Sequence, residues 1–233
     1  MASRPTTDDR PGAVPLLVGL GAAAAAFTAV FTGPRNRFWS RMTLTGLGLG
    51  SWALATSRPS RRIEFGPWRI LAGLASATVL YLTFGIGDRF ARRFVPGGDT
   101  DIRAIYTLRT LRPRPEIAAR LIAVIGPAEE MFWRGLVQSA LMRRYGRWRG
   151  SALATAAYGG VHVTSGNFTL LGAASTAGAH WCLLYALGMP LGALIVSHVA
   201  WDVWIFLVQP TGETEAIDPA GRVVRFRLDP AVA

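Results

Sequence analysis

Apolar residues fall into long runs separated by short polar stretches, and the lengths of these runs predict the elements of the fold. Residues 14–32 and 70–87 carry no charged side chain, over about the 20 residues that a helix needs to cross a bilayer. A third run, 168–201, is long enough for two such helices, broken near 188–190. Shorter candidates lie at 42–56, 117–142 and 149–164. We expect an all-α, polytopic membrane helix bundle with about seven transmembrane helices, within a range of six to eight.

The polar segment 88–115 divides the chain. Its Pro96-Gly97-Gly98 sequence predicts a turn, and residues 102–111 predict a short helix lying in the membrane interface. The pattern indicates four parts: a polar N-terminal tail (1–13), N-terminal spans with the interfacial segment (14–115), a catalytic helical core (116–207) and an exposed C-terminal tail (208–233). The last part includes a strand-like stretch at 222–228.

Composition supports a membrane protein and argues against a nucleic-acid partner. The chain has 233 residues, of which 51% are hydrophobic and 17% charged, with a net charge of +11. All 25 basic residues are arginines, and most lie between the apolar runs, where helix ends meet lipid headgroups. A nucleic-acid face would instead gather them on one surface. We expect a multi-pass protein of a bacterial cell membrane whose partners are the lipid bilayer and a substrate, with orientation and oligomeric state left open.

Three charged residues interrupt one of the apolar runs, in the sequence GPAEEMFWRG at 126–135. Each charge near the bilayer centre costs about 2.5–3.5 kcal/mol unless it is paired. Residues 128–142 are expected to be helical, with Pro127 at the helix start or at a kink. Glu130 and Arg134 are then i,i+4 neighbours that can form an ion pair. Glu129 is rotated by about 100° from Glu130, so the two carboxylates are expected to have different roles.

Two further polar pairs lie downstream with helical spacing. The sequence YGGVH places Tyr158 and His162 on one helix face, and HVAWD does the same for His198 and Asp202. Each pair alone is a weak signal, because single histidines in membrane helices are often structural. The order of the two pairs after the Glu-Glu-x-x-x-Arg motif is a stronger signal than either pair alone.

Together the three motifs resemble those of the CPBP family of CAAX proteases and bacteriocin-processing (Abi-like) enzymes, which are intramembrane glutamic endopeptidases. The resemblance covers roughly residues 115–206, and Gly135 matches the glycine that usually follows the arginine. It implies hydrolysis of a peptide or membrane-protein substrate without a cofactor. By analogy, Glu129 and His162 would activate a water molecule.

The resemblance also implies roles for the remaining polar residues. Glu130 would pair with Arg134 and hold the helix in register, and His198 with Asp202 would stabilise the oxyanion. A water-filled pocket in the membrane would give these groups a low-dielectric setting, and its expected walls are Tyr158, Trp133 and Trp201.

At two positions the sequence departs from the family pattern. The prenyl-protein proteases usually carry Asn where this chain has Asp202, and an ionised Asp can only accept hydrogen bonds. Asp202 is therefore either a protonated donor, which we favour because no basic residue lies within one turn, or an acceptor that orients His198. Tyr158 stands where Phe is common, a change expected to be chemically mild. For a bacterial protein, a peptide precursor or membrane-protein segment is a better candidate substrate than a prenylated protein.

Two other functions use the same residues. The two glutamates, two histidines and Asp202 could bind zinc or iron as an intramembrane metalloprotease, but no His-Glu-x-x-His motif is present and Arg134 would compete for Glu130, so no metal is expected. Alternatively, the bundle could be a non-enzymatic scaffold, an immunity factor or a proton-linked transporter.

Outside the motifs, His180 faces either helix packing or the cavity, and Asn167 is expected to cap the next helix.

Overall fold

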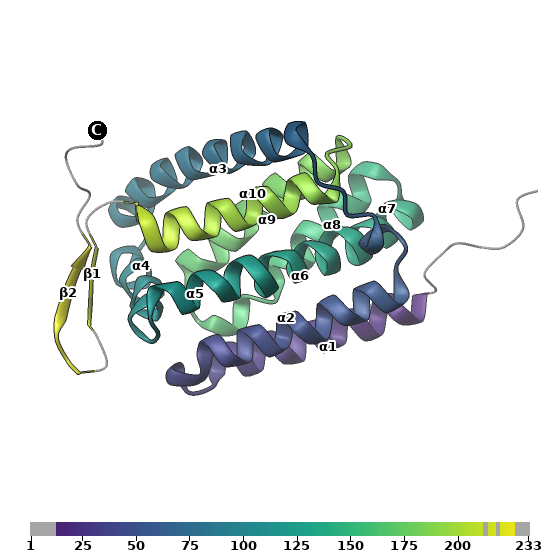
Figure 1. Cartoon of the computed structure of the whole chain (residues 1–233). Helices are drawn as coiled ribbons and strands as arrows, with labels where there is room; N and C mark the ends of the chain where they lie inside the picture. Colours follow the sequence, from purple (N-terminus) through teal and green to yellow (C-terminus); the bar gives the residue numbers. More distant parts are fainter. Residues whose placement is uncertain (1–12, 212–213, 218–219, 227–233) are drawn as a thin grey trace, which may run out of the picture.

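The computed structural model describes residues 13–211, 214–217 and 220–226, which form one helical bundle with a small hairpin at its end (Figure 1). Eight helical rods are present. Six are single helices: α1 (Ala13–Thr32), α2 (Phe38–Thr56), α3 (Pro67–Phe94), α4 (Gly98–Thr107), α8 (Arg147–Gly160) and α9 (Phe168–Ala186). The central rod joins α5 (Arg114–Arg120), α6 (Gly126–Glu130) and α7 (Ser139–Tyr145), and the last rod is α10 (Leu191–Val203) with its extension Trp204–Val208.

The predicted helical bundle is confirmed, although its helix count is not. The break expected near 188–190 separates α9 from α10, with Gly188 at a φ of +97° and Pro190 just before α10. The predicted cap of α9 is also present, because the Asn167 side chain accepts a hydrogen bond from the Leu170 N–H at 2.6 Å. The eight rods include α4, which corresponds to the short helix that the sequence analysis expected outside its count of seven transmembrane helices.

A short antiparallel hairpin follows the last helix. Strand β1 (Thr214–Ile217) pairs with β2 (Val223–Phe226), and Thr214 lies opposite Phe226. The second strand coincides with the strand-like sequence expected at 222–228. The polar tail predicted at 1–13 falls almost entirely outside the described residues.

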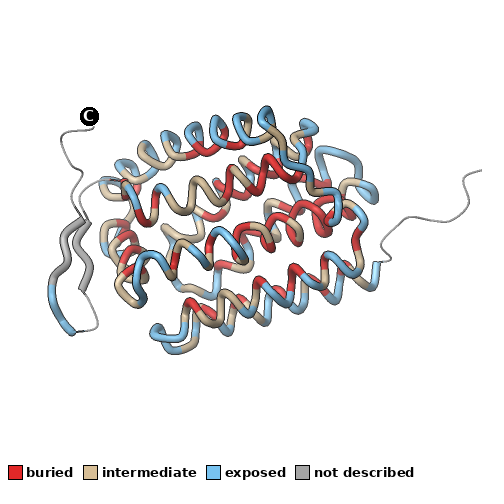
Figure 2. Tube along the Cα trace, viewed as in Figure 1, coloured by how far each residue is buried: buried red, intermediate tan, exposed pale blue. Residues whose placement is uncertain are grey.

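Three helices among the described residues are long and apolar enough to cross a membrane: Ala13–Thr32, Pro67–Phe94 and Leu191–Val208. The outward face of α3 is apolar, with Leu82 61% and Ile86 69% exposed. Figure 2 shows the exposed residues on the outer sides of α1, α2 and α3, and the buried ones facing the bundle interior. This distribution is that of a membrane protein, whose outer apolar surface contacts lipid.

The central rod lies between α2 and α10, and α3 covers the opposite side of α10 (Figure 1). Small residues allow these contacts. A Cβ added to Gly73 on α3 would lie 2.6 Å from the Ala193 carbonyl oxygen of α10. Close backbone approach at small residues is a usual means of packing helices in membranes, where burial of apolar side chains provides little driving force.

Pro127 does not begin a helix, because the central rod is helical from Arg114 through Tyr145. A π-helical turn at Leu121–Ile125 precedes the proline, and the Gly126 N–H bonds to the Leu121 carbonyl five residues earlier. This wider turn accommodates a residue that has no N–H to donate. A second π-helical stretch, Met131–Gln138, follows the glutamate pair. Such turns are frequent at functional sites.

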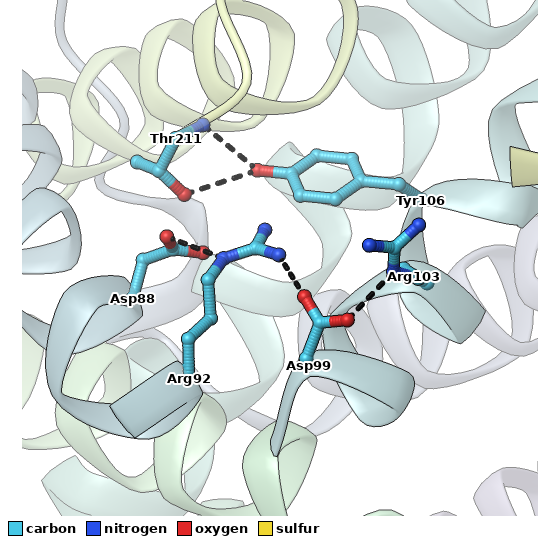
Figure 3. A network of polar contacts seen from close by, with 6 residues as sticks. All are labelled: Asp88, Arg92, Asp99, Arg103, Tyr106 and Thr211. Carbon is cyan, nitrogen blue, oxygen red and sulfur yellow. Dashed lines mark hydrogen bonds and ion pairs between the residues drawn. The ribbon is translucent and has the colours of Figure 1, made fainter. Parts of the chain in front are cut away.

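At one end of the bundle a polar network joins the end of α3 to α4 (Figure 3). Arg92 binds Asp88, at 2.9 Å, and Asp99, and Asp99 also accepts from the Arg103 Nε at 2.7 Å. The turn depends on Gly97, whose φ is +76°, and α4 begins four residues earlier than the predicted start at residue 102. The hydrogen bond from Arg103 lowers the pKa of Asp99, although partial burial acts in the opposite direction.

We predict that the network adds a small, pH-dependent stability. A depressed carboxyl pKa contributes stability above the unfolded pKa, about 3.9 for Asp, and that contribution is lost as pH falls through the lower, folded pKa. The Asp99→Asn variant should therefore melt slightly earlier than wild type at pH 7. The difference should be about 0.5 kcal/mol, since the Asp99 side chain is 45% exposed. Thermal melts in detergent should show the difference shrinking in strong acid. A difference that persists there would exclude a charge effect.

Candidate active site

The candidate site is organised around the Glu130 side chain on the central rod. Its Oε1 accepts from Arg134 Nη1 at 2.9 Å, and both side chains are fully buried, so the ion pair expected from their spacing is present. The same oxygen also accepts from His198 Nδ1 at 2.7 Å. One carboxylate oxygen therefore connects the central rod to α10, a contact between helices that the sequence spacing did not indicate.

Arg134 has aromatic as well as ionic partners. Its guanidinium carbon lies 4.9 Å from the centre of the Tyr158 ring and 5.1 Å from that of Trp181. A cation above an aromatic face is attracted to the ring's negative potential, most strongly where water is excluded. These rings therefore help to offset the cost of burying a full positive charge.

The imidazole of His198 is fixed on three sides. Besides the Glu130 contact on Nδ1, its Nε2 lies 3.5 Å from Asp202 Oδ2 one turn later in α10. Trp181 of α9 stacks on the ring, with the ring centres 4.0 Å apart and the planes 19° from parallel. The His198 ring therefore has little freedom to rotate.

A second polar chain holds Trp181 in place. Its indole Nε1 donates to Ser197 Oγ at 3.0 Å, Ser197 bonds Ser76 of α3 at 2.8 Å, and Ser76 bonds His180 Nε2 at 2.9 Å. His180 thus takes part in packing between helices. The sequence analysis did not single out Ser76, Ser197 or Trp181, and the available signal was a serine within the apolar run 70–87.

Glu129 has a different environment from its neighbour. It is 7% exposed, and its Oε2 accepts a hydrogen bond from the Tyr158 hydroxyl of α8 at 3.0 Å. Tyr158 therefore makes a contact with the carboxylate that Phe could not make, a difference that the sequence analysis did not anticipate. The two glutamates bind different groups, as the rotation between them predicts.

His162 lies one turn after Tyr158, at the end of α8. Its Nδ1 is 2.9 Å from the Tyr158 carbonyl oxygen, which can only accept, so Nδ1 carries the proton. In the neutral ring the lone pair is then on Nε2. The ring packs against Phe27 and Phe31 of α1, with centre separations of 5.3 and 5.5 Å.

A small cavity adjoins Glu129. Its volume is about 10 Å³, and it is lined by Phe27, Met42, Thr45, Gly46, Leu49, Ala128, Glu129, Phe132 and Trp133. This is roughly the space for one water molecule. Trp133 is part of the lining as expected, but Tyr158 and Trp201 are not. Trp201 packs instead against Phe84 and Trp181, with ring centres 4.7 and 5.7 Å apart, so the three residues do not together form the walls of this cavity.

The described residues contain no cluster of three or more histidine, cysteine, aspartate or glutamate side chains arranged to hold a metal ion. Several polar groups of the site are instead bound to one another. Glu130 Oε1 is held by Arg134 and His198, whereas the buried Glu130 Oε2 has no hydrogen-bond partner among the described residues.

Gly135 allows the link between α2 and α3 to reach the central rod. A Cβ at this position would lie 2.5 Å from Ser60 Oγ. Ser57 donates to the Gly135 carbonyl at 2.8 Å, and Ser60 donates to that of Met131 at 2.9 Å. These bonds brace the π-helical stretch that contains Arg134.

Comparison with known families identifies this part of the chain. Residues 115–204 match the family model described as type II CAAX prenyl endopeptidase Rce1-like. This segment, which is less than half of the chain, is similar to the Rce1-like endopeptidases. The match confirms the resemblance to the CAAX proteases inferred from the motifs, and the family is one of proteases. No curated protein and no solved structure matches the chain. All six candidate catalytic residues lie in the Rce1-like segment, whereas Phe27 and Ser76 lie outside it.

We predict that the two glutamates differ in their effect on stability. The Glu130→Gln variant removes the charge that faces Arg134 and His198, and breaking a fully buried ion pair costs about 3–5 kcal/mol. The Glu129→Gln variant keeps an acceptor for the Tyr158 hydroxyl and should melt near wild type. Thermal melts of both purified proteins in the same detergent measure the difference, and equal destabilisation would contradict it.

Proposed function

We propose that the protein is a multi-pass intramembrane endopeptidase that hydrolyses a peptide bond with a water molecule activated by Glu129 and His162. The observation that supports this most directly is the division between the adjacent glutamates. Glu130 is bound by Arg134 and His198, whereas Glu129 lines the small cavity. The Rce1-like match favours a peptidase over a scaffold, an immunity factor or a transporter.

In the proposed reaction, a water molecule beside Glu129 attacks the carbonyl carbon of the substrate. The carboxylate of Glu129 takes a proton from the water as the new C–O bond forms, and His162 Nε2 accepts a hydrogen bond from the same water. Collapse of the tetrahedral intermediate breaks the C–N bond, and the proton held by Glu129 passes to the leaving nitrogen. The bond from His162 Nδ1 to the Tyr158 carbonyl keeps Nε2 available for this role.

His198 would stabilise the oxyanion through its Nε2–H. Its Nδ1–H is bound to Glu130, and the 3.5 Å from Nε2 to Asp202 is longer than a good hydrogen bond. Without any rotation of the ring, that N–H can therefore also bond a developing negative charge beside Asp202. Asp202 acts as an ionised acceptor that orients this N–H. This differs from the protonated donor favoured from the sequence, because His198 itself lies one turn from Asp202 and can supply a positive charge.

Cleavage by purified protein tests the proposal. The protein in lipid vesicles is given two substrates, a prenylated CAAX peptide and an unmodified transmembrane peptide, and products are identified by mass spectrometry. We expect cleavage of at least one, with Glu129→Gln lowering the rate by about 10²–10⁴-fold, the range for loss of a general base.

Two controls accompany this assay. Glu116→Gln changes a glutamate of α5 that is 37% exposed and paired with Arg120, and it should leave the rate unchanged. Chelator treatment should have no effect, whereas activity that is lost on chelation and restored by zinc would favour a metalloprotease. Full activity in the Glu129→Gln variant would reject the proposed mechanism.

A separate prediction concerns Asp202. If it orients His198 as an ionised acceptor, Asp202→Asn removes the negative charge and should slow cleavage at every pH, by up to about 10⁴-fold as for other orienting carboxylates. If Asp202 were a neutral donor, the amide would replace it with little loss and a flatter alkaline limb. The pH dependence of cleavage by the variant distinguishes the two, and retained activity would overturn the acceptor role.

A further inference from the structure

Tyr158 has contacts with both residues that are proposed to activate the water. Its hydroxyl donates to Glu129 Oε2 at 3.0 Å, and its backbone carbonyl accepts from His162 Nδ1 at 2.9 Å. Among the polar contacts of the site, these two connect Glu129 on the central rod to His162 at the end of α8. A phenylalanine at this position would keep the carbonyl contact and lose the hydroxyl contact.

Packing fixes the position of the Tyr158 ring. The residue is 5% exposed, and its ring meets Trp133 edge-on at 5.3 Å between ring centres. On another side, a Cβ added to Gly178 of α9 would lie 2.7 Å from Tyr158 Cδ1, so the ring rests directly on the α9 backbone. The hydroxyl is thus aimed at Glu129 by contacts from two neighbouring rods.

The hydroxyl also determines which part of the Glu129 carboxylate is engaged. Oε2 is bound by Tyr158, and a carboxylate oxygen that accepts such a bond is held in one orientation. The second oxygen, Oε1, then has a defined direction toward the water it is to deprotonate. A donor to the carboxylate also favours its ionised form, which is the form that acts as a base.

We propose that Tyr158 is a positioning residue of the peptidase: its hydroxyl orients Glu129, while its carbonyl fixes the tautomer of His162. The inference rests on the proposed function, because it assigns Tyr158 a part in that reaction.

The test is the Tyr158→Phe variant, compared with Tyr185→Phe as a matched control. Tyr185 also has a hydroxyl that bonds the central rod, to Ser139 Oγ at 2.7 Å, but it makes no contact with Glu129 in the structure. We expect Tyr158→Phe to lower kcat/KM by about 10- to 100-fold, the effect of losing a hydrogen bond to a charged group. The acid limb of its pH–rate profile should move to higher pH, and that of Tyr185→Phe should stay at the wild-type position.

A measurement that needs no activity separates this inference from the proposed function. Melting temperatures of wild type, Tyr158→Phe, Glu129→Ala, which removes the acceptor that Gln would keep, and the double variant form a double-mutant cycle. We expect the two changes to be non-additive, because each alters the same hydrogen bond. Additive changes, or an unmoved acid limb in an active Tyr158→Phe enzyme, would overturn the role of Tyr158. If the changes in melting temperature are non-additive but the protein cleaves no peptide, the hydrogen bond is established. The proposed function, and with it the role of Tyr158 in that reaction, would then be rejected.

Discussion

The site depends on one carboxylate oxygen that two basic side chains share. Glu130 Oε1 binds Arg134 within its own helix and His198 from α10, at 2.9 and 2.7 Å. Charges buried in a membrane bundle are costly unless paired, so these groups constrain how the central rod and α10 can be rotated and shifted. Once the two helices are held in this register, the positions of the other side chains of the site follow. Glu129 faces away toward Tyr158, and His198 presents Nε2 beside Asp202.

The π-helical stretch after the glutamates contributes to this arrangement. In a regular α-helix each backbone carbonyl is bound by the N–H four residues later, whereas the Arg134 carbonyl here accepts from the N–H of Ser139, five residues later, and from the Ser139 hydroxyl at 3.0 Å. A π-helical turn widens the helix and loosens its hydrogen-bond ladder, and such a stretch requires support from outside. Ser57 and Ser60 supply it through bonds to the Gly135 and Met131 carbonyls. The glycine after the arginine therefore has a physical role, which is to let a neighbouring backbone approach.

The sequence predicted those features that depend on neighbours along the chain. Apolar runs predicted the long helices, i,i+4 spacing predicted the Glu130–Arg134 pair, and a polar residue before an apolar run predicted the Asn167 cap. It did not predict contacts that depend on helix rotation. The hydrogen bond from Tyr158 to Glu129 requires α8 to rest against Gly178 of α9, and no local pattern encodes that packing.

The role of Pro127 and the residues that line the pocket could likewise not be predicted from the local sequence. A proline in an apolar run can begin a helix or lie within one, and the outcome here depends on a π-helical turn at Leu121–Ile125 that no residue type specifies. Trp133 and Trp201 both follow polar motifs in the sequence, yet Trp133 lines the cavity beside Glu129 whereas Trp201 packs against Phe84 of α3. Which side of a rod faces the site is decided by the packing of the whole bundle.

The N-terminal helices are part of the site even though they lie outside the Rce1-like segment. Phe27 of α1 is fully buried, packs against His162 and Trp133, and lines the cavity beside Glu129. Ser76 of α3 holds the serine to which Trp181 is bonded. Without these two helices, His162 would lose its contacts with Phe27 and Phe31, and the polar chain from Trp181 to His180 would lack Ser76. The motif residues supply the chemical groups, but their geometry is a property of helices from both halves of the chain.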